Sequence, residues 1–207
     1  MKKLLLTSAF LSLFLCAAQE KETPDFYLKA NALFLPVGML NAGIEYQIAP
    51  QYTVQADLFV SPWKSFLGHY AQMYMLGADG RYYFDEAFSK WYVGANVTAT
   101  RFIMQKWNYW NDMPYQFTEN SPVYNTRDLY QDGFSFLVGA VGGYQHQINE
   151  RLNLDFYLGI GYNASFYQGF HKYLNIRYDE ETTRKWNRSG EWIPYRGGLM
   201  ISYKLFK

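Results

Sequence analysis

The chain has 207 residues, 19 basic against 18 acidic side chains, a single cysteine, and an aromatic content of 20%. This length fits one domain, the balanced charge argues against a nucleic-acid partner, and one cysteine excludes a disulfide framework. The fold of this aromatic-rich domain must therefore be read from the pattern of its residues.

The first 18 residues have the three parts of a secretory signal peptide: a basic start, an apolar run and small residues at the end. We predict cleavage after Ala18, which leaves residues 19–207 as a single domain without cysteine. The alternative is a lipoprotein signal at Cys16. That reading needs a small residue directly before the cysteine, whereas Leu15 is large.

Alternation of apolar and other residues predicts eight β-strands. In residues 152–167 every even position is apolar and every odd position is glycine, polar or tyrosine, which gives a strand one apolar face. No apolar run after the signal reaches the roughly 20 residues that a membrane helix needs. The predicted strands cover residues 26–35, 40–48, 52–61, 70–84, 91–103, 133–147, 152–167 and 194–206.

The connections between these strands differ in length at the two ends. Those after the second, fourth and sixth strands are short, as is the one after the first. The one after the third is longer, and those after the fifth and seventh, residues 104–132 and 168–191, are long loops. An even strand number with short turns at one end and long loops at the other is the outer-membrane plan. We therefore predict an all-β, eight-stranded antiparallel up-and-down transmembrane β-barrel with both termini at the periplasmic end.

The apolar face of the strands has features that favour contact with lipid. It carries no charged residue before Arg101, as expected where a charge at mid-depth costs about 2–4 kcal/mol. The last strand ends on Phe206 and resembles the signal that the barrel assembly machinery reads. Aromatic residues cluster near strand ends and would form interface girdles: Tyr46, Tyr52, Tyr82, Phe84, Trp91, Tyr144 and Tyr203 at the periplasmic side, and Phe134, Phe166 and Tyr195 at the other.

The opposite face carries eight charged residues that would meet inside the barrel. An eight-stranded barrel has room inside for little more than side chains, so these charges must pair. We interpret them as a structural network that plugs the lumen; a gated ion path is the alternative. The members are Lys29, Glu45, Asp57, Asp79, Arg81, Asp155, Arg196 and Lys204.

The first long loop is the best candidate for binding at the surface. It places Trp107, Tyr109, Trp110 and Tyr115 among asparagines and aspartates, a mixture that can stack on sugars and bind their hydroxyls. The alternative is that these rings rest on the headgroup region of the membrane or on a neighbouring loop.

Catalysis, metal binding and a cofactor are not expected. His69 and His171 lie near the long-loop end, where they could meet Ser65 or Ser165 and an acid, while His146 lies near the short-turn end. No spacing among these residues is diagnostic, because a triad is defined by geometry. There is no Cys/His metal pattern and no glycine-rich phosphate loop before a helix.

Four stretches of the chain resemble a known family of bacterial outer-membrane barrels. They are residues 29–34, 41–46, 78–84 (ADGRYYF) and 142–162, where Gly143-Tyr144-Gln145 and Gly159-Ile160-Gly161-Tyr162 stand out. The chain is similar to the domain of unknown function numbered 3575, which tends to have a glutamate at the position of Asp155. The resemblance implies an eight-stranded barrel in the outer membrane of a Gram-negative bacterium and no known activity. It also points to fimbrial or surface-assembly components as partners.

The function expected from the sequence is a structural or surface-binding role in the outer membrane, with the long loops presenting the binding surface. Two alternatives remain open. One is a lipid-modifying enzyme active at the barrel rim. The other is a soluble, secreted barrel that binds an apolar ligand inside, since such a barrel would also keep one face free of charge.

Overall fold

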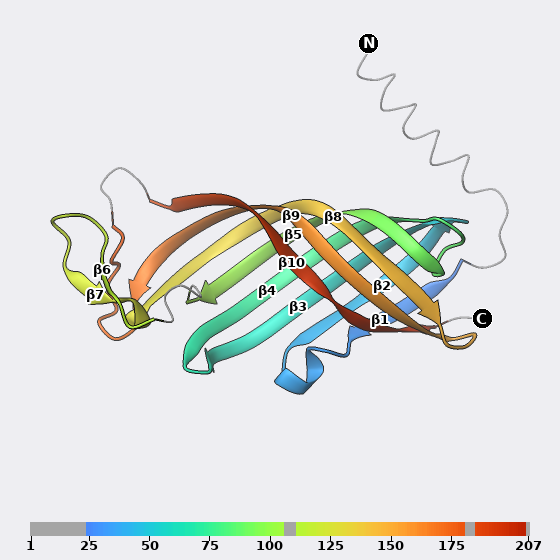
Figure 1. Ribbon diagram of the computed structural model, residues 1–207, viewed down its shortest axis with the longest axis horizontal. Helices are drawn as coiled ribbons and strands as arrows, with labels where there is room; N and C mark the ends of the chain where they lie inside the picture. The colour runs from blue at the N-terminus through green and yellow to red at the C-terminus, as the bar shows by residue number, and fades with distance from the viewer. Residues whose placement is uncertain (1–23, 106–110, 181–184, 206–207) are drawn as a thin grey trace, which may run out of the picture.

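Eight strands close into one antiparallel barrel in the computed structural model (Figure 1). It describes residues 24–105, 111–180 and 185–205, so the predicted signal peptide and Phe206 lie outside the described residues. The predicted eight-stranded antiparallel barrel is confirmed. The barrel strands are β1 (Phe26–Asn31), β2 (Leu40–Ala49), β3 (Tyr52–Phe66), β4 (His69–Tyr83), β5 (Lys90–Met104), β8 (Leu129–Gln147), β9 (Leu152–His171) and β10 (Asn187–Lys204).

Each strand pairs with its neighbour in the chain, and β1 closes the ring against β10. The long loop between β5 and β8 contains a small hairpin of β6 (Pro114–Gln116) and β7 (Val123–Asn125), which lies at the opposite end of the barrel from the C-terminus (Figure 1). Two short 3-10 turns, η1 (Leu35–Val37) and η3 (Thr126–Asp128), complete the elements. No helix in the described part of the chain is long and apolar enough to cross a membrane.

The third strand is longer than predicted, and the connection after it is a two-residue turn rather than a longer loop. β3 continues past Pro62 to Phe66, and Leu67 and Gly68, both with positive φ, turn the chain directly into β4. Pro62 is tolerated because β2 begins opposite Val60, so no strand lies on the side where its missing N–H would have donated.

The first strand is shorter than predicted, ending at Asn31 instead of residue 35. The Asn31 side chain accepts a hydrogen bond from the Leu33 backbone N–H at 3.1 Å, a local turn that competes with strand pairing. Gly38, with φ of +70°, then ends the turn that follows. The first connection, residues 32–39, is therefore longer than the short connection expected from the sequence.

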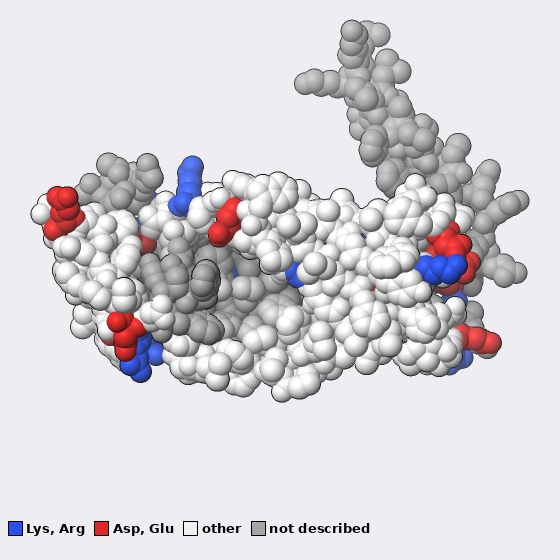
Figure 2. All heavy atoms as spheres, in the orientation of Figure 1, with Lys and Arg blue, Asp and Glu red and all other residues white. Residues whose placement is uncertain are grey.

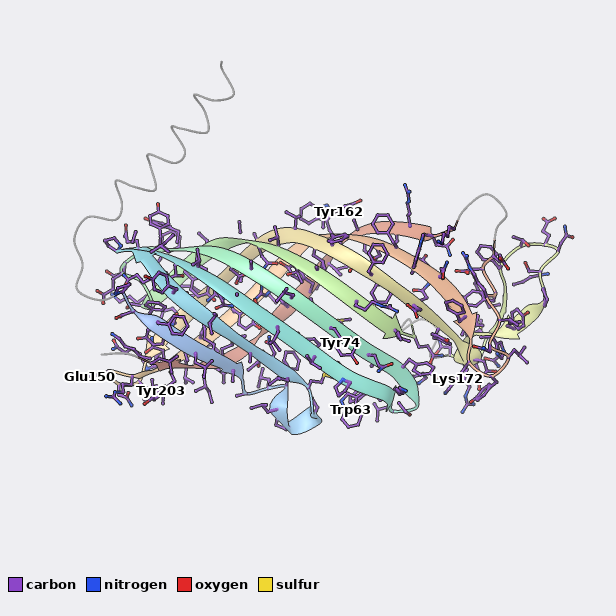
Figure 3. All side chains as sticks on the ribbon, turned by 180° about the vertical axis from the view of Figure 1, so that it is seen from behind. Trp63, Tyr74, Glu150, Tyr162, Lys172 and Tyr203 are labelled. Carbon is purple, nitrogen blue, oxygen red and sulfur yellow. The ribbon has the colours of Figure 1, made fainter. Side chains whose placement is uncertain are left out.

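The predicted alternation of faces holds along the strands. On β9, the even-numbered Leu158 and Ile160 are 65% and 53% exposed, whereas Asp155, at an odd-numbered position of the same strand, is fully buried. Figure 3 shows Tyr74 and Tyr162 pointing outward from the wall, with Glu150 and Tyr203 at the short-turn end and Lys172 at the loop end. The apolar face of the sheet is thus the outside of the barrel, and the polar face is its core.

One residue of the predicted aromatic girdle is on the wrong face. The register of β10 against β9 shifts between Pro194 and Arg196. Because of this bulge, Tyr195 and Arg196 both face the lumen, and the Tyr195 hydroxyl donates to the Asn96 side chain. The prediction that Tyr195 faces outward is therefore wrong.

Candidate functional site

Four charged side chains form the centre of the lumen. Lys29 on β1 donates to Glu45 on β2 at 2.7 Å and also to Asp155 on β9. Arg81 on β4 binds the same two carboxylates, at 3.3 Å from Glu45 and 3.0 Å from Asp155. All four side chains have no exposed surface, so this is a fully desolvated cluster with two cations between two anions.

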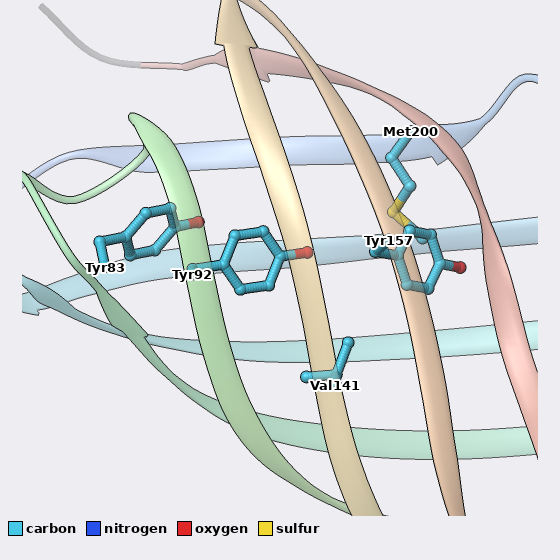
Figure 4. Packing of buried hydrophobic residues seen from close by; sticks show 5 residues of the cluster. All are labelled: Tyr83, Tyr92, Val141, Tyr157 and Met200. Carbon is cyan, nitrogen blue, oxygen red and sulfur yellow. The ribbon is translucent and has the colours of Figure 1, made fainter.

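Neutral donors complete the hydrogen bonding of these carboxylates. The Tyr83 hydroxyl donates to Glu45 at 2.8 Å and the Tyr92 hydroxyl donates to Asp155 at 2.8 Å. Figure 4 shows the two rings side by side from β4 and β5, and the Arg81 guanidinium lies 4.7 Å from the centre of the Tyr92 ring. A buried ion pair stabilises a fold only when its remaining lone pairs are satisfied in this way.

A second layer lies next to the first and is centred on Arg196. Its guanidinium donates to Asp57 at 2.8 Å and to Asp79 at 2.7 Å, and Asp79 also accepts from Arg81 at 3.0 Å, which joins the two layers. Gly159 makes room for the Arg196 stem, because a Cβ there would lie 2.6 Å from Arg196 Cγ. Glycines of the lumen face thus admit long charged side chains.

The structure does not bring Lys204 into this network. Its ammonium lies 2.7 Å from Asp25, and both side chains are more than a fifth exposed. Lys204 is the last residue of β10 and pairs with Tyr27 near the start of β1, so it sits at the mouth of the barrel. The polar pattern correctly placed Lys204 on the inner face, but position along the strand separates it from the other seven residues.

The charges of the network are paired across the lumen. Three basic residues (Lys29, Arg81, Arg196) meet four acidic ones (Glu45, Asp57, Asp79, Asp155), a formal charge of 3 − 4 = −1. Six of the seven form direct ion pairs with two or more partners. Chemically, this arrangement ties β1, β2, β3, β4, β9 and β10 together across the barrel axis.

The predicted surface-binding aromatics fall into two groups. Trp107, Tyr109 and Trp110 lie outside the described residues. Tyr115, on β6, packs edge-on against Tyr178 with ring centres 5.8 Å apart, in a cluster with Leu129 under the loops. Tyr115 thus contributes to packing between the two long loops.

His69, His171 and Ser165 each form hydrogen bonds with groups other than one another. His69 Nδ1 lies 3.0 Å from Gln105 Oε1. His171 is buried, and its Nδ1 accepts from the backbone N–H groups of Tyr173 and Leu174 at 3.2 Å. Ser165 instead accepts from Asn163 at 2.9 Å. No group of residues suited to hold a metal ion occurs within residues 24–105, 111–180 and 185–205.

The lumen tyrosines are the site residues that the sequence reading missed. Tyr83, Tyr92 and Tyr157 are all nearly buried inside the barrel, and Tyr157 donates to Asn41 at 3.0 Å. Their position in the alternation was a usable signal, since Tyr83 follows Asp79 and Arg81 on the inward face. Aromatic residues were assigned to the outer girdles from the sequence, so the role of these three tyrosines as hydrogen-bond donors in the lumen was not predicted.

The fold and the lumen together define a small closed β-barrel with an ion-pair network as its core. The chain belongs to the family described as protein of unknown function (DUF3575), whose model matches residues 5–205. The family resemblance expected from the sequence is therefore confirmed. No curated protein matches the chain.

Proposed function

We propose that the protein is an outer-membrane β-barrel that serves as a closed, rigid anchor and presents its long loops outside the cell for binding. The observation that carries this proposal is a belt of exposed apolar side chains around the described strands. Its outward positions hold no Asp, Glu, Lys or Arg between the short turns and the loop end. Members that are more than half exposed include Leu76, Val97, Val138, Leu158 and Ile160.

Such a belt is unusual for a protein in water. The largest apolar patch on a soluble monomer is typically about 300–600 Å², whereas this surface runs around the barrel. In Figure 2 charged side chains gather at the two ends, and the outer wall between them is almost free of them. The first outward charges at the loop end, Arg101 and Asp132, pair with each other, which is consistent with the headgroup level.

The interior argues against a soluble barrel that binds an apolar ligand. Such a barrel would need an apolar lumen, but the centre of this one holds the buried cluster of Lys29, Glu45, Arg81 and Asp155. β9, with 20 residues, is also longer than the about 9–11 residues that a tilted strand needs to cross a bilayer. This excess would extend the loop ends of β8 and β9 beyond the membrane, where Leu129 and His171 contact the residues of the β6–β7 hairpin.

The proposal is tested by fractionating cells that express the full chain and running the membrane extract on a gel, boiled and unboiled. We expect the protein in the outer-membrane fraction, with a faster unboiled band, because small outer-membrane barrels stay folded in detergent until heated. A protein recovered in the soluble fraction with a single band would contradict membrane insertion.

The orientation of the loops gives a separate prediction. A membrane-impermeant thiol reagent should label Glu119→Cys, in the turn between β6 and β7, on intact cells. It should label Ile148→Cys, in the turn between β8 and β9, only after the cells are broken. Both positions are exposed, so accessibility to the reagent depends only on the side of the membrane. Labelling of Ile148→Cys on intact cells would show that the orientation is reversed.

A further inference from the structure

In the part of the chain that the structure describes, the barrel wall is incomplete on one side of its loop end. β1 stops at Asn31, opposite Met200, while β10 continues to Asn187 with no described strand paired to that edge. β2 starts opposite Val60, while β3 continues to Phe66. A gap therefore lies between β10 and β3 above the turn that joins β1 to β2. Figure 2 shows a hollow in the face of the molecule beside β10.

Both edges of this gap carry a proline that prevents strand pairing. Backbone groups of alternate residues point to opposite sides of a strand. The register places the missing N–H of Pro194 on the side of β10 away from β9, and that of Pro62 on the side of β3 away from β4. Proline on an edge blocks the addition of another strand. The gap is therefore not suited to bind an extended peptide.

A cavity of about 100 Å³ lies behind the gap, inside the loop half of the barrel. Its apolar wall includes Phe34, Phe59, Met73 and Met75. The Phe34 ring, from the β1–β2 turn, meets Phe59 edge-on with ring centres 5.3 Å apart. Methionine side chains adapt to flexible apolar groups. The paired Asp57 and Arg196 form the polar end of the cavity, toward the ion network.

The rim of the gap is apolar on its outer side. In the β1–β2 turn, Leu33 is 59% exposed, Leu35 52% and Val37 40%. The Trp63 indole N–H donates to the Val37 carbonyl at 2.9 Å and holds this turn against β3. A water-soluble ligand would have to pass this rim, whereas a hydrocarbon chain would contact it favourably.

We propose that the gap admits the end of one acyl chain of a surrounding membrane lipid, which occupies the cavity between Phe34, Phe59, Met73 and Met75. This inference rests on the proposed function, because it requires the rim to lie in the membrane. A cavity of about 100 Å³ fits a chain end and excludes a whole lipid. The polar floor formed by Asp57 and Arg196 limits how deeply the chain can enter.

Quenching by brominated lipid tests directly whether an acyl chain enters the cavity. After signal cleavage the chain has no cysteine, so a bimane group can be attached to Met75→Cys in the full barrel. The labelled barrel is placed in phosphatidylcholine vesicles with or without bromine near the ends of the acyl chains. Leu76→Cys, the outward neighbour, is 66% exposed and reports contact with lipid. Leu137→Cys, buried inside β8 and absent from the cavity lining, reports a lumen position without access.

We expect quenching at Met75→Cys of at least half that at Leu76→Cys, and little at Leu137→Cys. A second pair, Phe59→Cys in the cavity and Leu58→Cys outside, should behave in the same way and covers the case that one variant does not fold. Quenching at the outer positions alone would overturn the inference and leave the proposed function intact. No quenching at any position would overturn the membrane location itself.

Discussion

Replacing Lys29 by methionine is expected to lower the free energy of unfolding by about 3–5 kcal/mol, the usual loss when one partner of a buried ion pair is removed. Methionine keeps the length of the side chain but leaves Glu45 and Asp155 without their shared ammonium, and neither carboxylate has any exposed surface. Urea titration of the barrel in lipid vesicles, followed by tryptophan fluorescence, measures the change.

Lys204→Met is the matched control for this prediction. It removes the same group from the same barrel, but the ion pair of Lys204 with Asp25 is partly exposed to solvent, and such pairs contribute about 0–1 kcal/mol. Equal losses for Lys29→Met and Lys204→Met would mean that burial of the network does not matter to stability.

A double-mutant cycle separates the ion pair from lost packing. Asp155→Asn alone should also destabilise the barrel, because it leaves Lys29 and Arg81 with one carboxylate fewer. The double variant, Lys29→Met with Asp155→Asn, lacks two charges of opposite sign. Its loss of unfolding free energy should therefore be smaller than the sum of the two single losses. An additive result would show that Lys29 and Asp155 do not act on each other.

Alternation along the chain was sufficient to predict which residues share a face, and hence the barrel and most of its core. Lys29, Arg81 and Asp155 were placed inside because they alternate with apolar residues, and a face in contact with lipid would not tolerate their charges. Their partners were not predictable in detail. Which charged side chains meet depends on the stagger between strands, and alternation with a period of two does not determine that stagger. Lys204 shows this, since it has the right face but lies too near the barrel mouth to reach the network.

The errors have local causes that act against the simple strand pattern. The predicted third strand ends directly before Pro62, although β3 continues past this proline because the neighbouring strand has already ended there. A bulge at Pro194 changed the face of Tyr195 without changing the apolar pattern. Asn31 ended β1 through a side-chain hydrogen bond that no periodicity records. Pro62, Pro194 and Asn31 all border the gap in the wall, which is why the sequence did not reveal it.

A charged residue in the apolar belt should destabilise the barrel strongly. Leu158→Arg should cost about 2–4 kcal/mol and strongly reduce the amount of folded barrel in the outer membrane. Leu158 lies midway between Leu152 and Phe166 on the outer face of β9 and is 65% exposed. An arginine there would have to leave water for hydrocarbon. The measured quantities are the unboiled band in the outer-membrane fraction and the free energy of unfolding in vesicles.

The two environments predict opposite outcomes for this substitution. If the belt faced water, an arginine at such an exposed position would change stability by no more than about 0.5 kcal/mol and would reduce an apolar surface. Leu174→Arg, in the loop after β9 and 56% exposed, is the control and should have little effect in either case. Leu76→Arg, on β4 across the barrel, should repeat the loss seen at Leu158. A normal yield of both belt variants would therefore place the apolar face in water.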